Sequence, residues 1–248
     1  MSATGVIPAR YGSTRLPGKS LVKLCGKPLV QWVYERAEKA RRLNRLVIAT
    51  DDQRIADAVV AFGGDAVMTR EDHPSGTDRI AEAVSGYDVD IIINIQGDEP
   101  MIDPNLIDQL VAELERDSTW DMVTAVCPIH NSDDLHSQAV VKAVWAADGK
   151  ALYFSRSLIP FPRDPSDLPG DFQHWRHIGI YGYRKSFLEK LVKTPPCMLE
   201  KVEKLEQLRA LDIGGRIKIV TTHEAGLGVD TPDDVPKAEA ALRAAGLA

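Results

Sequence analysis

Residues 89–100 read VDIIINIQGDEP, and this stretch decides which fold the sequence predicts. Its run of isoleucines is the clearest strand signal in the chain, and a polar break follows at once. Asp98 comes just after the run, between a glycine and a proline, which is an awkward place for a side chain that serves packing alone. We therefore expect a buried strand that delivers a carboxylate to one edge of a sheet.

Helical patterns alternate with short apolar runs on both sides of this stretch. Strands are predicted at TGVIPA, RLVIAT and DAVM, and helices at residues 28–40, 52–63, 76–84 and 103–116. The last of these begins with Asp103 as N-cap and Pro104 in its first turn. Such alternation predicts an α/β, Rossmann-like fold with a mostly parallel sheet and helices on both faces. Sheets of this kind bind ligands beyond the carboxyl ends of their strands.

The second half of the chain has a different rhythm. From about residue 121 it is rich in strands, and Asp148-Gly149 between two apolar runs predicts a hairpin. A long helix is predicted over residues 199–214, where glycines end it. We expect one domain over residues 1–248 with a β-rich insertion at about 129–183.

Composition excludes several classes of protein. The 248 residues carry a net charge of −6, which argues against general nucleic-acid binding. Three scattered cysteines without a CxxC spacing indicate neither a disulfide framework nor a cysteine zinc site. No run of about 18 apolar residues occurs, so we expect no membrane insertion and a cytoplasmic location.

The opening loop, IPARYGSTRLPGKSL, is cationic in an acidic protein. It supplies Arg10, Arg15 and Lys19, while Gly12 and Gly18 free backbone N–H groups that can point at an anion. Arginine suits a forked contact with phosphate, and lysine acts as a mobile point charge. The composition indicates a triphosphate site, although the spacing fits neither a Walker A loop nor a GxGxxG fingerprint. The alternative is a solvated basic loop.

Two aspartates are candidate metal ligands. Asp98 would lie at the same sheet edge as the opening loop, where a carboxylate can hold Mg²⁺ against phosphates. Asp230, in GVDTPDD, is a second candidate. Its alternative is strong, because Asp230, Thr231 and Pro232 also resemble an ordinary helix N-cap.

Cationic side chains also end strands in the predicted insertion. Arg156 and His177 could grip a carboxylate substrate, although a lone histidine beside a strand is more often structural. The six histidines show no HxH or HExxH spacing, so a histidine metal site is not predicted.

Taken together, the motifs resemble those of a known enzyme family. The segments IPARYGSTRLPGKSL, SGTDR, NIQGDEPMI, ALYFSRSLIP, HIGIYGYR, LEQLR and GVDTPDD are similar, in this order, to the 3-deoxy-manno-octulosonate (KDO) cytidylyltransferases. This resemblance implies one nucleotidyltransferase domain that converts CTP and KDO into CMP-KDO and pyrophosphate, for lipopolysaccharide biosynthesis. It also implies a requirement for Mg²⁺ and a homodimer formed largely through the β-rich insertion.

The resemblance further implies roles for individual residues. Arg10 and Lys19 match catalytic, triphosphate-binding positions with Arg15 close by, and Asp98 and Asp230 match the magnesium ligands. The nucleotide-handling positions are Ser75, Gly76 and Gln96. The sugar-binding positions are Gln96, Arg156, His177, Tyr181, Glu206 and Gln207.

Other functions stay open at this point. An NAD-dependent dehydrogenase would need GxGxxG after the first strand, which is missing, although Asp51 and Asp52 do end the second strand. A non-catalytic nucleotide-binding module would bind CTP without turnover. Within the family, the acid sugar could be 8-amino-KDO or another ulosonic or sialic acid.

Overall fold

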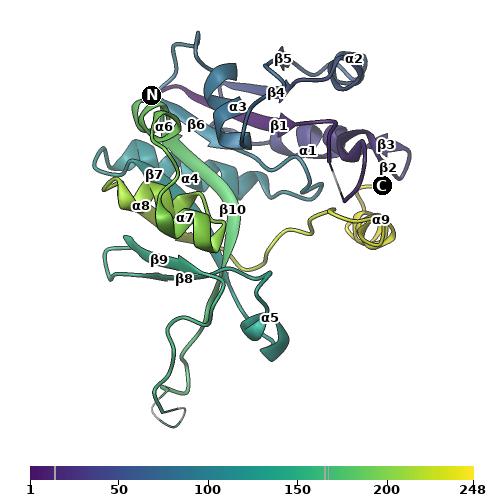
Figure 1. The fold of residues 1–248 in the computed structure, drawn as a ribbon. Helices are drawn as coiled ribbons and strands as arrows, with labels where there is room; N and C mark the ends of the chain where they lie inside the picture. The colour runs from purple at the N-terminus through teal and green to yellow at the C-terminus, as the bar shows by residue number, and fades with distance from the viewer. Residues whose placement is uncertain (14, 165, 167) are drawn as a thin grey trace. The chain divides into compact units, whose positions relative to one another are not determined.

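The structure is a computed structural model that describes residues 1–13, 15–164, 166 and 168–248. It divides into two compact units, drawn with their elements in Figure 1. Unit 1 comprises Met1–Ala112 with Gly226–Ala248, and unit 2 comprises Glu113–Ala225. The prediction of one domain with an insertion at about 129–183 stays a prediction.

Unit 1 contains the predicted parallel sheet. Its strands are β1 (Ala3–Ala9), β4 (Arg45–Thr50), β5 (Ala66–Met68) and β6 (Ile91–Asn94). They lie in the order β6-β1-β4-β5, and every neighbouring pair is parallel. The three isoleucines of β6 are fully buried, as expected for a strand covered on both faces.

Helices flank this sheet, which confirms the predicted α/β, mostly parallel architecture. They are α1 (Leu29–Ala37), α2 (Gln53–Ala61), α3 (Gly76–Ala83) and α4 (Pro104–Arg116), whose last turn enters unit 2. The side chain of Asp103 accepts the Asn105 amide at 3.0 Å, so α4 begins as predicted.

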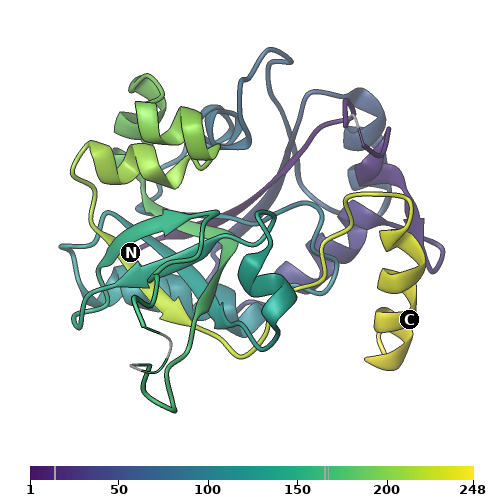
Figure 2. The same cartoon turned by 60° about the horizontal axis from the view of Figure 1, so that its bottom comes forward.

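The rest of unit 1 consists of short elements and one terminal helix. The 3-10 helix η1 (Lys19–Leu21) precedes the short strands β2 (Lys23–Leu24) and β3 (Lys27–Pro28). Helix α9 (Asp234–Ala244) lies beside this N-terminal segment in Figure 2, where the Cys25 amide donates to Glu239 Oε1 at 2.7 Å. The C-terminal segment is therefore part of unit 1.

Unit 2 is built around strand β7 (Met122–Pro128). It pairs antiparallel with β10 (Trp175–Arg184) and parallel with β11 (Ile217–Thr221). Strands β8 (Lys142–Trp145) and β9 (Ala151–Ser155) form the hairpin predicted at Asp148-Gly149. The helices of unit 2 are α5 (Ser132–His136), α6 (Lys185–Lys193), α7 (Met198–Glu203) and α8 (Gln207–Asp212).

The prediction of one long helix over residues 199–214 is wrong. Lys204 adopts a left-handed conformation with φ of 55°, and its amide donates to the carbonyl of Glu200 at 2.8 Å. This geometry ends α7, and α8 begins anew at Gln207. A lysine carries no sequence signal for such a turn, which is usually made by glycine.

None of the helices in the described part of the chain is long and apolar enough to cross a membrane.

Candidate active site

The basic loop of unit 1 is a built structure. The carbonyl of Tyr11 accepts two amides, from Ser13 at 2.8 Å and from Gly18 at 3.2 Å. The guanidinium of Arg54 stacks on the Tyr11 ring at 3.4 Å from its centroid. Gly18 has φ of 65°, a left-handed conformation that favours glycine, and it is the residue that precedes η1. The loop thus has a defined backbone conformation, and its interpretation as a triphosphate site stays a prediction.

Lys19 lies between the two predicted metal ligands. Its Nζ is 2.6 Å from Asp98 Oδ2 and 3.0 Å from Asp230 Oδ1. The Arg15 guanidinium reaches the same Asp230 oxygen at 3.1 Å. The structure thus brings together four residues that lie as far apart as positions 15 and 230 in the sequence.

The carboxylates of this cluster set the charge state of Lys19. Burial acts to lower the pKa of Lys19, but Asp98 and Asp230 outweigh it through charge and hydrogen bonds, so the pKa is raised above its ordinary value. Lys19 is therefore a permanent cation at neutral pH. It offers a fixed positive charge to an anionic ligand.

A backbone hydrogen bond holds the segments of Asp98 and Asp230 next to each other. The amide of Val229 donates to the carbonyl of Asp98 at 2.9 Å, which places Asp230 beside Asp98. Gly97 allows this turn to approach β1, because a Cβ there would lie 2.8 Å from the carbonyl oxygen of Pro8. The sequence placed Gly97 at the turn but could not reveal this close approach.

The helix-cap interpretation of Asp230 is wrong. Helix α9 begins at Asp234, with Asp233 at its N-cap position. Asp234 instead accepts the Thr231 hydroxyl at 2.8 Å and the amides of Thr231 at 2.9 Å and Asp230 at 3.2 Å. These hydrogen bonds, the hydroxyl first, lower the pKa of Asp234 to about 2. The carboxylate of Asp230 does not cap the helix and pairs with Lys19 and Arg15 instead.

The donor set of this cluster fits Mg²⁺. Within the described residues, no group of three or more His, Cys, Asp or Glu side chains could hold a metal ion by itself. Mg²⁺ prefers few protein ligands and completes its shell with water and phosphate oxygens. The carboxylates of Asp98 and Asp230 suit such an ion, since they lie close enough to share one cation, Lys19.

The other predicted nucleotide-binding residues also lie in unit 1. Arg10 follows β1 and is exposed. Ser75 caps α3, since its hydroxyl oxygen accepts the Asp78 amide at 3.2 Å, and Gly76 is the first helical residue. Gln96 follows β6, with its side chain 3.5 Å from Asn94 Oδ1. Arg10 and Gln96 thus follow strands of the parallel sheet and Gly76 begins a helix that flanks it, while the role of these residues toward a nucleotide stays a prediction.

The predicted sugar-binding residues lie in unit 2. Arg156 follows β9, and its guanidinium donates to the carbonyls of Glu203 at 2.7 Å and Gln138 at 2.8 Å. Its amide donates to the Glu203 carboxylate at 3.0 Å. These contacts fix the side chain of Arg156 in one direction while leaving the group partly exposed.

His177 is not the cation that the sequence suggested. It is 8% exposed, and burial lowers its pKa to about 3, so the ring is neutral. Its Nε2 lies 2.9 Å from Thr124 Oγ1, which in turn donates to the carbonyl of Ile180 at 2.8 Å. Because that hydroxyl proton is committed, Nε2 is the donor to Thr124. Any role of His177 toward a carboxylate must be that of a neutral group.

Tyr181, Gln207 and Glu206 form a connected group. The Tyr181 hydroxyl donates to Gln207 Oε1 at 3.4 Å, and burial together with the charge of Glu206 raises the pKa of Tyr181. Gln207 is 3% exposed, and its buried Nε2 has no hydrogen-bond partner in the described part of the chain. A buried amide left without a partner is costly, so this donor is available to a water molecule or a ligand.

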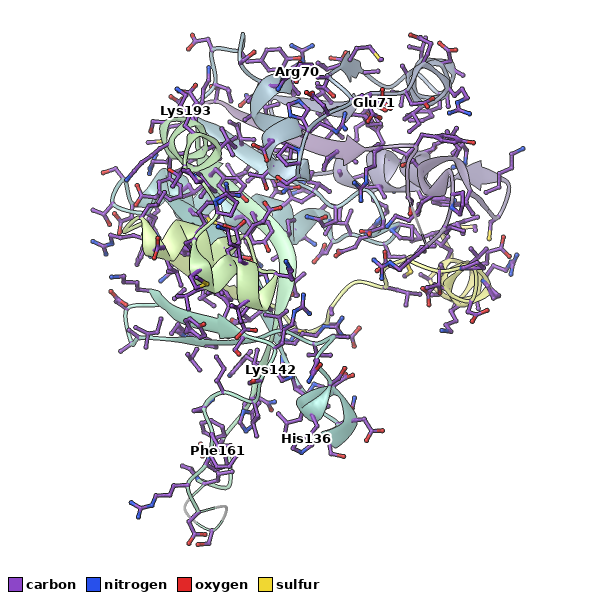
Figure 3. All side chains as sticks on the ribbon, viewed as in Figure 1. Arg70, Glu71, His136, Lys142, Phe161 and Lys193 are labelled. Carbon is purple, nitrogen blue, oxygen red and sulfur yellow. The ribbon has the colours of Figure 1, made fainter. Side chains whose placement is uncertain are left out.

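Sequence reasoning missed Lys142, labelled in Figure 3 at the start of β8. Its side chain is fully buried, and its Nζ donates to the carbonyls of Ser137, Val140 and Arg156 at 2.8, 2.9 and 3.0 Å. Burial lowers the pKa of Lys142. The group ties Arg156 to the segment that precedes β8, and only three-dimensional contacts could have revealed it.

The two acids after β4 that a dehydrogenase would use both pair with arginines. Asp51 pairs with the buried guanidinium of Arg79 at 2.8 Å. Asp52 caps α2 and pairs with Arg54 at 2.7 Å. Each carboxylate thus pairs with an arginine, while Asp51 Oδ1 is buried without a hydrogen-bond partner in the described part of the chain. The missing glycine fingerprint is what speaks against a dehydrogenase.

Comparison with known proteins defines the class of this fold and site. A family model described as cytidylyltransferase matches residues 4–219. A solved structure of CMP:2-keto-3-deoxy-manno-octonic acid synthetase complexed with CTP superposes with a TM-score of 0.94 at 42% identity, covering 99% of this chain and 100% of that one. The 4-diphosphocytidyl-2C-methyl-D-erythritol synthase of Anaerococcus prevotii, 12% identical with a TM-score of 0.65, shares the fold alone.

Curated relatives narrow the class further. The 3-deoxy-manno-octulosonate cytidylyltransferase of Syntrophotalea carbinolica is 49% identical, over 98% of this chain and 99% of the relative. Those of Geobacter sulfurreducens and Aliivibrio fischeri are 49% and 48% identical over 96% and 98% of this chain, and over 98% and 99% of the relatives. The chain belongs to the 3-deoxy-manno-octulosonate cytidylyltransferase family, and it is a nucleotidyltransferase.

Proposed function

We propose that the protein transfers the cytidylyl group of CTP to KDO, yielding CMP-KDO and pyrophosphate for lipopolysaccharide biosynthesis. The observation that carries this proposal is the cluster of Lys19, Asp98 and Asp230, which joins a phosphate-binding loop to two carboxylates. The family membership supplies the substrates: its relatives are named for KDO and its structural neighbour holds CTP.

The chain's own groups would act by positioning and by charge. Lys19 and Arg10 would bind the triphosphate and offset the charge that gathers on pyrophosphate as it leaves, with Arg15 nearby. Ser75 has its hydroxyl committed to capping α3, so residues 75 and 76 would contact the nucleotide through their backbone. Gln96 would contact the nucleotide or the sugar from the end of β6.

The reaction needs no covalent intermediate with the protein. The 2-hydroxyl oxygen of the sugar forms a bond to the α-phosphorus, the bond from that phosphorus to the β-phosphate oxygen breaks, and pyrophosphate leaves with the electron pair while the hydroxyl proton goes to solvent. Asp98 and Asp230 would hold Mg²⁺. When bound there, this ion would supply charge neutralisation on phosphate oxygens and acidify the attacking hydroxyl.

In unit 2 we propose that Arg156 binds the carboxylate of the acid sugar. The carbonyls of Glu203 and Gln138 already fix the direction of its guanidinium, and Lys142 holds its backbone carbonyl. His177, as a neutral ring, and the buried group of Tyr181, Gln207 and Glu206 would bind sugar hydroxyls, with the unpaired Gln207 amide as a donor.

We also propose that the protein is a homodimer. Unit 2 carries exposed large apolar side chains on the β8–β9 hairpin, on α7 and on the loop before β10, where Phe161 is labelled in Figure 3. They are Leu152, Phe161, Leu168, Phe172, Met198, Leu199 and Val202. Exposed large apolar side chains of this number in one unit support the proposal of an interaction surface.

Pyrophosphate release with CTP and a panel of acid sugars tests the proposed reaction. KDO should give the highest kcat/KM, above 8-amino-KDO and sialic acid, with no turnover when Mg²⁺ is removed. CTP binding without pyrophosphate release from any sugar would instead establish a non-catalytic nucleotide-binding module. A preference for another acid sugar would keep the reaction and correct the substrate.

A further inference from the structure

Lys19 occupies the position between the two carboxylates that a divalent cation would need. Its Nζ contacts Asp98 Oδ2 and Asp230 Oδ1, one oxygen from each group. The Lys19 side chain is 19% exposed, against 26% for Asp98 and 41% for Asp230. The ammonium is thus the most enclosed member of the cluster, and it is held by both of its neighbours.

Charge balance shows what this arrangement does. Two carboxylates meet Lys19 and Arg15, so the four side chains together are neutral. A divalent cation bound to both carboxylates would lie next to the ammonium, because its bonds to oxygen are only about 2.0–2.1 Å long. Repulsion at that distance is large, and the ammonium already takes one oxygen of each carboxylate. Bound metal and Lys19 in this position therefore exclude each other.

The ammonium of Lys19 can leave the two carboxylates by a movement of its side chain alone. The backbone is held in place, since the Lys19 amide donates to the carbonyl of Leu16 at 3.0 Å and the Leu21 amide donates to the carbonyl of Gly18 at 2.8 Å. The long stem of a lysine can swing its ammonium from carboxylate to phosphate at little cost. Arg15 is 66% exposed and pairs with a single oxygen, so it is weakly held by comparison.

We propose that Lys19 is a placeholder cation that keeps the Asp98–Asp230 pair closed to divalent metal until a triphosphate draws its ammonium away. The inference rests on the proposed function for its triphosphate. It makes nucleotide and metal binding interdependent, because the group that releases the carboxylates is the group that binds phosphate. By linkage, the metal must favour the nucleotide to the same degree.

Binding of Mn²⁺ alone to the full chain, followed by electron paramagnetic resonance or calorimetry, tests this proposal. Without nucleotide, wild-type protein should bind Mn²⁺ weakly, and Lys19→Met should bind it at least about tenfold more tightly, since the stem stays and the charge goes. Lys19→Arg keeps the charge and should stay weak. Lys23→Met, an exposed lysine of β2, should match the wild type.

A second variant ties the gained binding to this site. Adding Asp98→Asn to Lys19→Met should abolish the gain, and thermal unfolding should show that every variant is folded. Equal Mn²⁺ affinity of the wild type and Lys19→Met would overturn the proposal, as would a gain that persists without Asp98. Pyrophosphate release by the wild type is measured separately, so failure of the proposed reaction is distinguished from failure of the placeholder.

Discussion

The Val229 amide donates to the Asp98 carbonyl at 2.9 Å, and this backbone bond joins two segments that lie more than a hundred residues apart in the chain. The main chain therefore brings Asp98 and Asp230 close together, whatever their side chains do. The two carboxylates then both bind the ammonium of Lys19. A substitution that changes only a carboxylate should therefore leave the fold of unit 1 intact.

Asp230 and Asp234 should respond differently to substitution by asparagine. Asp230→Asn weakens one exposed ion pair, with Arg15, and one half-buried pair, with Lys19, while the hydrogen-bonding shape of the side chain stays. The melting temperature should therefore change by a few degrees at most while turnover is nearly lost. Asp234→Asn replaces a charged acceptor of two amides by a neutral one, and stability should fall by about 1 kcal/mol. Thermal unfolding and pyrophosphate release for both variants check this. Near-normal activity of Asp230→Asn would show that Asp230 is not a metal ligand.

Gly97→Ala should damage the site through the backbone. The new Cβ would lie 2.8 Å from the carbonyl oxygen of Pro8, which cannot move without distorting β1. We expect a loss of about 1–3 kcal/mol of stability and a clear fall in kcat. Gly86→Ala is the matched control, because no atom lies within 4 Å of its Cβ. If both variants behave like the wild type, the close approach does not position Asp98.

Arg156→Ala should raise KM for the sugar far more than KM for CTP. A charge-assisted contact of this kind is worth roughly 1.5–3 kcal/mol, equal to about a tenfold to hundredfold change. Steady-state kinetics with each substrate varied in turn measure the split. Arg163→Ala, an exposed arginine of the same unit, serves as control. A change confined to the CTP term would show that the role of Arg156 has been assigned wrongly.

Burial of His177 predicts a pH dependence of stability. Its folded pKa is about 3 against 6.5 for the unfolded group, so between these values the unfolded chain binds a proton that the folded chain does not. His177 therefore makes stability fall as pH drops from about 6.5 toward 3, by up to about 1.4 kcal/mol per pH unit. Denaturant unfolding from pH 7 to 4.5 should show a shallower slope for His177→Gln. The exposed His223→Gln should keep the wild-type slope; equal slopes in all three would contradict the assignment.

The parallel sheet could be predicted from the sequence because its signals are local. The isoleucines of β6, the Asp103 N-cap and the Asp148-Gly149 hairpin each act through neighbours in the chain. The break at Lys204 could not be predicted, because non-glycine residues seldom adopt a positive φ and nothing in the sequence marks the one that does.

Local sequence motifs also predicted part of the candidate site. Sequence motifs named Lys19, Asp98 and Asp230, but not that the lysine lies between the two carboxylates. The charge of His177 was mistaken, since burial, which no local pattern reports, lowers its pKa. Lys142 was missed because its partners are backbone carbonyls, which every residue offers.

The most direct test of the central claim, that Asp98 and Asp230 act through one ion, is a double-mutant cycle on kcat. Pyrophosphate release from CTP and KDO is measured at saturating Mg²⁺ for Asp98→Asn, Asp230→Asn and the double variant. Each single substitution should lower kcat by roughly a thousandfold, or about 4 kcal/mol. The double variant should be little slower than either single one, because the same ion is lost only once. Effects that multiply in the double variant would show that the two carboxylates act independently, and would contradict this account.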